Sequence, residues 1–346
     1  MERDGRRART VKVGVLSLAH VHAASYVDIL ARIADVEVRV ADPDGEGLGA
    51  PDRGRAGIES LGATDAGSYD ELFAWQPDAV IVTSENSRHR ELVERAADVG
   101  ADILCEKPLA TERADAYAIR DAVSRSGVRF VTAYPVRFAT SFRQLVGIRD
   151  SGALGEIVAV RGENNGKLPS SRDWFTDPVL AGGGALFDHV VHVADLLDVL
   201  LDSPPVSVAA VTNGILHRDR ADVETGGLVL VEYADGVIAS IDCSWSLPDT
   251  APRWGGVWLH VLATGGTADI DFFDAAVRGV DGATGSAVEL SIGENVDEAL
   301  LTAFLDMVRG DEHPPLPDLD AGLRSLSIVF AAQESARTGR RVAVAL

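Results

Sequence analysis

A lysine that follows an apolar run is the first candidate for chemistry in this chain. Lys107 comes after ADILCE and before Pro108, so it lies at the end of a predicted strand, and it is one of only three lysines. The carboxyl ends of parallel strands border the crevice in which doubly wound sheets bind ligands. Partial burial there lowers the pKa of a lysine, so Lys107 could exchange a proton with a substrate hydroxyl.

A second candidate group lies in the segment GGGALFDHVVHVAD. Asp188, His192 and Asp195 follow one another at spacings of four and three, which places them on one face of a helix. A carboxylate and an imidazole four residues apart can hydrogen-bond one hydroxyl together, which is the arrangement that a hydride-transfer site needs in order to remove the alcohol proton. The glycines at 182–184 would let the backbone turn tightly, or approach a ligand, before that helix.

The segment GVLSLAHVHAASY, residues 14–26, has a strand pattern before it and a helix pattern after it. A dinucleotide-binding turn usually carries three glycines here, and this chain has Ser17, Ala19 and His22 in their places. In such a turn, backbone N–H groups and the N-terminus of the helix bind the pyrophosphate. Small residues such as Ser17 and Ala19 therefore still let the pyrophosphate come close to the backbone. We interpret the segment as a nucleotide loop that keeps its backbone donors, with His22 pointing either away from the pyrophosphate or towards it.

Asp42 supports this interpretation because it ends the second predicted strand, about twenty residues after the loop. An aspartate at that place binds the ribose hydroxyls of NAD and disfavours the 2′-phosphate of NADP. The sequence therefore predicts NAD, with NADP less favoured. Turn chemistry in the stretch Asp-Pro-Asp-Gly is compatible with the same residue.

The elements that must position these residues alternate along the first third of the chain. Strand patterns lie at 11–16, 36–42, 78–84, 101–108 and 128–134, with helical patterns between them. This alternation predicts an α/β domain of Rossmann type with a doubly wound parallel sheet, over residues 1–133.

The alternation of strand and helix patterns ends after residue 134, where several β patterns follow one another with Gly and Asp turns. The strand EIVAVRGEN at 156–164 and the helix through Leu201 come first, and helical patterns at 296–309 and 319–338 close the chain. We expect an α+β domain over residues 134–346, built on a large, open, mostly antiparallel sheet.

Composition excludes several classes of function. A net charge of −21 argues against a nucleic-acid partner, and no stretch has the apolar length that a membrane span needs. The opening MERDGRRART has no apolar run of signal-peptide type, so we expect a cytoplasmic protein. Cys105 and Cys243 lie in strand-like apolar runs and are expected to be buried thiols.

With these stretches identified, the chain resembles the glucose–fructose oxidoreductase, inositol dehydrogenase and rhizopine-catabolism (Gfo/Idh/MocA) family over nearly its whole length. The segments that carry the resemblance include CEKPLA, WFTDPVLAGGGALFDHVVH and the tail ESARTGRRVAV. It implies that Lys107, Asp188 and His192 form the catalytic set, with His192 as acid/base. It also implies an NAD(P)-dependent dehydrogenase that acts on a ring hydroxyl or ketone of a sugar, an inositol or a derivative.

The resemblance further implies that Asn86 and His89 border the cofactor and that Tyr134 and Arg137 lie near the substrate. The predicted cofactor-binding set contains Ser17, Leu18, Ala19, His20, Val21, His22, Asp42, Ser84, Asn86, His89, Glu106 and Lys107. The predicted substrate-binding set contains Lys107, Tyr134, Arg137, Asn164, Trp174, Asp188, His189 and His192. A homodimer or homotetramer through the C-terminal sheet is implied as well.

Two other functions remain open on the residues alone. The histidines at 20, 22, 89, 189 and 192, with Asp188 and Glu106, could converge as ligands in a metal-dependent hydrolase or lyase. We nevertheless predict no metal, because only His-x-His has a familiar ligand spacing and Lys107 would repel a dication. A non-catalytic NAD-binding relative is favoured by the missing glycines and opposed by the complete Lys–Asp–His set.

Overall fold

The structure is a computed structural model that describes residues 9–48, 50–273, 276–280, 282–291 and 293–345. Residues 1–8 of the charged opening segment therefore lie outside the described residues. The chain divides into two compact units. The first contains residues up to Glu106, Ala114–Ala133 and Asp297–Asp318, and the second contains Lys107–Arg113, Tyr134–Val296 and Leu319 onwards.

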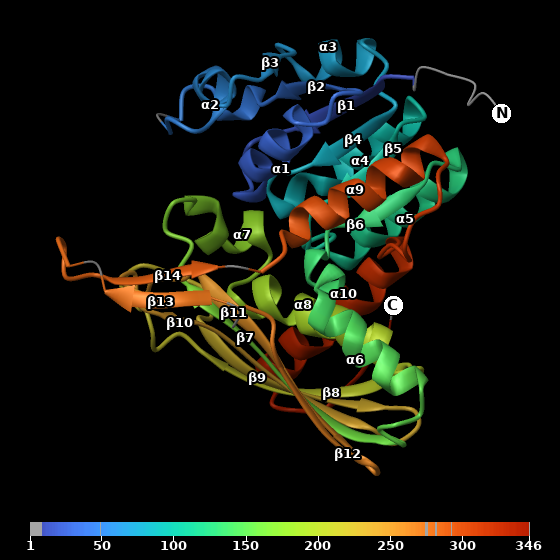
Figure 1. The fold of residues 1–346 in the computed structure, drawn as a ribbon, viewed down its shortest axis with the longest axis vertical. Helices are drawn as coiled ribbons and strands as arrows, with labels where there is room; N and C mark the ends of the chain where they lie inside the picture. The colour runs from blue at the N-terminus through green and yellow to red at the C-terminus, as the bar shows by residue number, and fades with distance from the viewer. Residues whose placement is uncertain (1–8, 49, 274–275, 281, 292, 346) are drawn as a thin grey trace. The chain divides into compact units, whose positions relative to one another are not determined.

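The first unit contains a sheet whose strands are all parallel, with the order β3-β2-β1-β4-β5-β6 (Figure 1). This is the order of a doubly wound nucleotide-binding fold, as the alternating pattern predicts. The central strands are apolar and almost fully buried because helices cover both faces of such a sheet. The strands are β1 (Val11–Leu16), β2 (Val36–Ala41), β3 (Thr64–Asp65), β4 (Ala79–Val82), β5 (Asp102–Cys105) and β6 (Phe130–Thr132).

Helices connect these strands, and each buries an apolar stripe while its charged side chains stay in water. The helix α4, for example, buries Leu92, Val93 and Ala96 and ends before Gly100, which has the positive φ expected after a helix. The helices of this unit are α1 (His22–Ala31), α2 (Gly54–Ser60), α3 (Tyr69–Ala74), α4 (His89–Asp98), α5 (Arg113–Ser126) and α9 (Val296–Arg309).

The second unit contains a seven-stranded sheet with the order β12-β11-β7-β10-β9-β8-β15. Its neighbours are antiparallel except β7 and β10, which run parallel, so the sheet is mixed. Its strands are β7 (Ile157–Lys167), β8 (Pro205–Asn213), β9 (Gly226–Tyr233), β10 (Ile238–Leu247), β11 (Gly255–Ala263), β12 (Gly266–Asp271) and β15 (Val342–Ala343). The strands β13 (Ala276–Val280) and β14 (Ala287–Ser291) form a separate antiparallel pair.

Helices cover one face of this sheet (Figure 1). They are α6 (Thr140–Asp150), α7 (Pro178–Ala181), α8 (Ala185–Leu200) and α10 (Leu319–Thr338). The helix α8 lies against β7 so closely that a Cβ on Gly162 would come within 2.3 Å of Val193. The alternation of buried and exposed residues along β9 and β10 follows from this arrangement, since the opposite face has no helix on it in the described residues.

The expected domain boundary at 133/134 is one of several crossings between the units. The short segment 107–113 belongs to the second unit, and α9 returns to the first. The return of α9 has a visible cause, because Arg129 of the first unit donates to the carbonyl oxygens of Met307 and Val308 and Arg309 pairs with Asp35.

Within the described residues, one helical segment is long and apolar enough to cross a membrane, judged by length and composition alone. This corrects the sequence-based expectation that no stretch has the apolar length of a membrane span. The segment runs over 178–200, and 72% of its window is buried inside the fold. It combines α7 and α8, and α8 is apolar on several sides because both the sheet and α10 pack against it. Both cysteines are free, buried thiols, as expected.

Candidate functional site

The loop between β1 and α1 makes a glycine-type turn without a glycine. Ser17 has a φ of +76°, a left-handed conformation in which L-residues are strained. Its hydroxyl donates to Oδ1 of Asp42 at 3.1 Å and accepts from the backbone N of Ala19 at 3.1 Å. These two bonds hold the turn that a glycine would adopt freely, so the serine keeps the shape of a nucleotide loop.

The backbone donors of this loop are more occupied than the sequence led us to expect. The N–H groups of Ser17, Ala19 and His20 donate to Ala41 O, Ser17 Oγ and Thr83 O. The N–H of His22, at the start of α1, donates to Nδ1 of His20 at 3.3 Å, so an imidazole caps the helix. The first turn of α1 contains no acidic residue, which leaves its positive end suited to an anion.

Asp42 directly follows β2, and its carboxylate oxygens all have hydrogen-bond donors. Arg53 donates to both carboxylate oxygens at 2.8 and 3.0 Å, and the backbone N of Gly54 donates at 2.7 Å. Burial alone would raise the pKa of Asp42, but the bonded Arg53 guanidinium holds that pKa below its ordinary value. Glu85 lies on the other side of Arg53, with Oε1 3.5 Å from Nη1. Sequence reasoning missed Arg53 because it stands in an aperiodic stretch between two elements.

The other predicted cofactor residues of this unit lie at the ends of β1 and β4. Leu18 and Ala19 are buried in the loop after β1. Ser84 follows β4, Asn86 begins the turn Asn86–Arg88, and His89 begins α4; all three are buried. Carboxyl ends of neighbouring parallel strands meet at one edge of a sheet, so the fold gathers these residues as predicted. Their contact with a cofactor stays a prediction.

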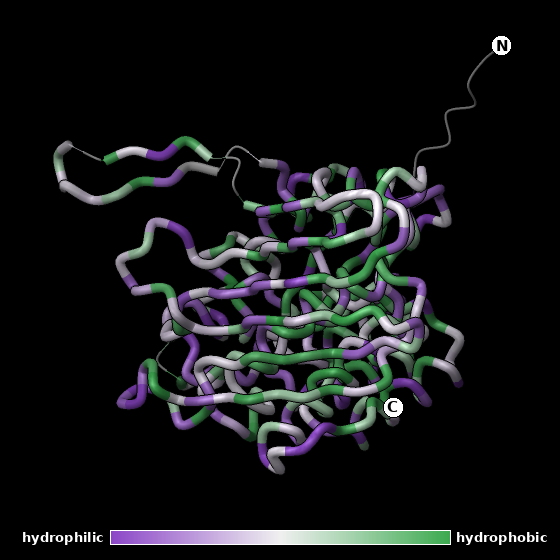
Figure 2. Tube along the Cα trace, turned by 90° about the horizontal axis from the view of Figure 1, so that it is seen from below, coloured by the Kyte–Doolittle hydropathy of each residue, from purple (hydrophilic) through white to green (hydrophobic). Residues whose placement is uncertain are grey.

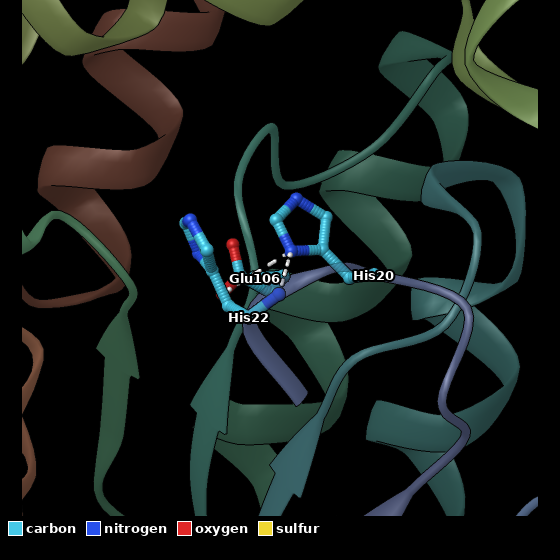
Figure 3. A group of neighbouring side chains, drawn as sticks. All are labelled: His20, His22 and Glu106. Atoms are coloured by element: carbon cyan, nitrogen blue, oxygen red, sulfur yellow. Dashed lines mark hydrogen bonds and ion pairs between the residues drawn. The ribbon is translucent and has the colours of Figure 1, made fainter. Parts of the chain in front are cut away.

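His20 and His22 lie close to Glu106, the residue that follows β5 (Figure 3). Nδ1 of His22 lies 3.0 Å from Oε1 of Glu106, and Nδ1 of His20 lies 3.8 Å from the same oxygen. Tyr26 donates its hydroxyl to that oxygen at 2.8 Å, and burial raises the pKa of Tyr26, so it remains a donor. The imidazole of His22 is therefore directed to the end of β5.

The second unit holds the predicted proton-transfer group. Nζ of Lys107 donates to Oδ1 of Asp188 at 2.8 Å and to the backbone oxygen of Asp188 at 3.2 Å. Oδ2 of Asp188 accepts from the indole N of Trp245 at 3.1 Å and lies 3.2 Å from Nε2 of His189. The structure thus brings together Lys107, Asp188 and His189, and it adds Trp245 as an anchor.

The partners of Asp188 decide its protonation. Burial would raise the pKa of this carboxyl, but the Lys107 ammonium and the His189 imidazole beside it hold the pKa well below its usual range. Asp188 therefore stays ionised and cannot serve as a proton donor near neutral pH. Its position suits a group that fixes the Lys107 ammonium.

His192 stands one turn further along α8, beside a buried aromatic ring. The centroids of the His192 and Tyr134 rings are 6.2 Å apart in an edge-to-face arrangement. The Tyr134 hydroxyl is 2.6 Å from Oγ of Ser325 on α10, and burial raises its pKa above the range in which it could titrate. Tyr134 therefore packs against the candidate base, and its role as a substrate ligand stays a prediction.

Three other predicted substrate residues make internal contacts. Arg137 donates to both carboxylate oxygens of Asp195 at 2.6–2.9 Å. We therefore do not count Asp195 among the proton-transfer residues, although it lies on the same helix face as Asp188. Asn164 donates its amide to the backbone oxygen of His189 at 3.1 Å and so fixes α8 to β7. Trp174 stacks on the neighbouring Phe175 with centroids 4.0 Å apart. Substrate contact for these residues stays a prediction.

The glycine run before α8 serves the backbone turn. Gly182 has a φ of +88° and ends α7, and a Cβ on Gly184 would meet the carbonyl oxygen of Glu224 at 2.0 Å. The Glu224 carboxylate accepts the N–H groups of Gly184 at 2.8 Å and Leu186 at 3.1 Å, which caps α8. This glutamate is another residue that sequence reasoning missed, and it sets where the catalytic helix begins.

Comparisons with known proteins agree with the fold of the two units. A family model described as an oxidoreductase family with an NAD-binding Rossmann fold matches residues 34–134. A second model, described as the GFO/IDH/MocA C-terminal domain, matches residues 142–269. The solved structure of GenD2 from gentamicin A biosynthesis, in complex with NAD, shares the fold with a TM-score of 0.84 and 24% identity, covering 100% of this chain and 99% of that one.

Two curated relatives cover most of the chain. A D-xylose 1-dehydrogenase (NADP(+)) of Haloferax volcanii is 27% identical over 88% of this chain and 93% of its own length. A scyllo-inositol 2-dehydrogenase (NAD(+)) of Bacillus subtilis is 25% identical over 85% of this chain and 87% of its own length. These matches favour an oxidoreductase with a nicotinamide cofactor over a metal-dependent hydrolase or a non-catalytic relative. Because the two family models together match most of the chain, the chain belongs to the Gfo/Idh/MocA family of NAD(P)-binding oxidoreductases.

Proposed function

We propose that this oxidoreductase is an NAD-dependent dehydrogenase that oxidises a secondary hydroxyl of a sugar or polyol, or reduces the corresponding ketone. The observation that carries the proposal is the Lys107–Asp188 pair at 2.8 Å with His192 one turn along the same helix. The two relatives named above, which act on D-xylose and scyllo-inositol by their names, support the substrate class.

Each of the three residues has a chemical task in this proposal. Lys107 donates a hydrogen bond to the substrate oxygen, and its ammonium stabilises negative charge that develops there. Asp188 stays ionised and keeps the ammonium in place. His192 takes the hydroxyl proton during oxidation and returns it during reduction. NAD⁺, when bound, supplies the hydride acceptor.

The first unit fits a dinucleotide. Its strand order, the left-handed Ser17 turn and the acid-free first turn of α1 are suited to a diphosphate at the helix start. Ser17, Leu18, Ala19 and Val21 would lie along it. For Asp42 to bind the ribose, a ribose hydroxyl would have to replace one of the hydrogen bonds that its carboxylate now accepts.

The charges around Asp42 favour NAD over NADP. Arg53 is held by the Asp42 carboxylate and faces Glu85, so the three buried side chains carry one net negative charge when ionised. A 2′-phosphate would add negative charge there, whereas a ribose hydroxyl would add none. We therefore propose a lower affinity for NADP than for NAD.

A substrate screen tests the activity. The purified chain is incubated with NAD or NADP and a panel of aldoses, inositols and sugar derivatives, and reduced nicotinamide is followed by absorbance. We expect at least one sugar or polyol to give NADH, more slowly or not at all with NADP. Binding of neither nucleotide, measured by calorimetry, would refute the proposal.

We further propose that the chain self-associates through the open face of the large sheet. Strand alternation places exposed apolar side chains on this face, and Figure 2 shows such hydrophobic positions mixed with hydrophilic ones along the strands. The exposed apolar residues are Val211, Leu228, Leu230, Ile238 and Leu262. Light scattering after gel filtration should show a dimer or tetramer, and Leu228→Arg with Leu230→Arg should give a monomer.

The location of the protein in the cell is a proposal of the same kind. Two free, buried thiols are compatible with a reducing compartment, so we propose the cytoplasm. Fractionation of the source cells with an antibody would test it.

A further inference from the structure

Two imidazoles and one carboxylate of the first unit gather where the chain leaves β1 and β5 (Figure 3). The ligand atoms of His20, His22 and Glu106 all lie within 4.8 Å of one another. His20 and Glu106 are 2% and 0% exposed, and the side chain of His22 is 30% exposed. The cluster is therefore mostly shielded from water and is open on the side of His22.

The separations suit ligands that share one ion. A tetrahedral zinc ion binds nitrogen and oxygen at about 2.0–2.2 Å, which places its ligand atoms roughly 3.3 Å apart. The two separations from Oε1 of Glu106 are 3.0 Å to Nδ1 of His22 and 3.8 Å to Nδ1 of His20, on either side of that value.

The surroundings of the cluster resemble the outer shell of a metal site. Tyr26 donates to the Glu106 carboxylate at 2.8 Å, and ligating carboxylates are commonly oriented by such a bond. The N–H of His22 reaches Nδ1 of His20 at 3.3 Å, a long hydrogen bond that a metal–nitrogen bond would replace. The sequence predicted no metal, in part because Lys107 would repel a dication, and the proposal below departs from that prediction. The charge of Lys107, the residue after Glu106, is balanced by Asp188 within its own unit.

We propose that His20, His22 and Glu106 bind one divalent transition-metal ion of the Zn²⁺ class, with a fourth position for water or an anion oxygen. Two imidazole nitrogens and one carboxylate oxygen suit Zn²⁺, Co²⁺ and Ni²⁺, whereas Ca²⁺ and Mg²⁺ require more oxygen ligands. The site uses none of the residues assigned to proton transfer, and the proposal includes no hydrolase activity. It does not rest on the proposed dehydrogenase, since metal binding is measured without substrate.

Metal titration of the chain without a histidine tag tests the proposal. The protein is stripped with a chelator, Co²⁺ or Zn²⁺ is added, and the bound metal is counted after dialysis. We expect one equivalent in the wild type, a visible Co²⁺ absorption of low-coordinate type, and a melting temperature that rises with Zn²⁺. Binding of no equivalent, or a Co²⁺ spectrum equal to that of the hydrated ion, would overturn the site.

Variants locate the metal. His22→Ala should lose the equivalent and the Co²⁺ spectrum, and Glu106→Gln is the second ligand variant if the first does not fold. Tyr26→Phe should keep the equivalent with about 10–100-fold lower affinity, as for other outer-shell partners. The matched control is His260→Ala, since His260 pairs with Asp269 in the second unit and should leave the site intact. Retention of the metal by both His22→Ala and Glu106→Gln would refute the assignment.

Discussion

Two aspartates, one in each unit, are paired with a cation in different ways: Asp42 is buried and Asp188 is partly buried. Both carboxylate oxygens of Asp42 accept hydrogen bonds from the Arg53 guanidinium, and one of them also accepts from the backbone N–H of Gly54. Asp188 receives a single ammonium, that of Lys107, and its other oxygen is held by Trp245 and His189. A guanidinium stays charged and rigid, whereas an ammonium is a compact charge on a flexible stem. The first pair is a fixed part of the nucleotide unit, and the second is suited to chemistry.

The largest expected effect is the loss of turnover when the second pair is broken. Lys107→Ala and His192→Ala should each lower kcat by about 10²–10⁴-fold, the usual contribution of a positioned acid or base. Lys12→Ala is the matched control. Among the described residues, the Lys12 ammonium donates a hydrogen bond to the backbone oxygen of Trp75 and to no side chain. Steady-state kinetics on the substrate found in the screen measures the effect. A fully active Lys107→Ala variant would refute the role of this lysine.

Breaking the first pair should affect stability. Asp42→Asn leaves the buried Arg53 charge without its main partner and should lower the free energy of unfolding by about 3–5 kcal/mol. Asp70→Asn, which removes an exposed carboxylate bonded to Arg95 in the same unit, should cause no measurable loss. Urea unfolding of the three proteins tests this. Equal losses of unfolding free energy in both variants would show that Asp42 stabilises the fold no more than a surface aspartate does.

Both pairs also predict how stability depends on pH. Asp42 and Asp188 have pKa values below the ordinary 3.8, so each stabilises the fold above that value and loses this contribution as pH falls through its folded pKa. Wild-type stability should therefore decrease from about pH 5 downwards. In Asp188→Asn the decrease should be shallower, as acid titration followed by circular dichroism would show. If stability falls equally steeply with pH in Asp188→Asn and in the wild type, the pKa of Asp188 is not lowered in the folded protein.

The smallest expected effect comes from the Ser17 hydroxyl. Ser17→Ala keeps the left-handed backbone and its strain but removes the bonds to Asp42 and to Ala19 N, which should cost about 1–2 kcal/mol. Urea unfolding measures this loss, and turnover at saturating cofactor should be unchanged. A variant as stable as the wild type would mean that the hydroxyl adds nothing to the first pair.

Much of the fold was predictable because its elements are strongly periodic. The terminal helices have the expected bounds 296–309 and 319–338, and the parallel sheet follows from the βα alternation. The parallel pairing of β7 with β10 could not be predicted, since these strands are far apart in the sequence. The return of α9 to the first unit depends on tertiary contacts such as Arg309 with Asp35.

The candidate site was predictable in residue type and less so in contacts. Sequence spacing brought Asp188 and His192 to one helix, but it also included Asp195, which is bound by Arg137. Arg53, Trp245 and Glu224 act as partners from distant segments, and no local pattern marks a partner of that kind. The pairing of His22 with Glu106 likewise arises only when β1 and β5 enter one sheet.

The central claim is that one unit binds the nucleotide and the Lys–Asp–His group of the other does the chemistry. Calorimetric titration of NAD into the wild type and His192→Ala tests it most directly, alongside NADH production by both. We expect equal NAD affinities for the two proteins and turnover by the wild type alone. A His192→Ala variant that loses NAD affinity as severely as turnover would contradict this division.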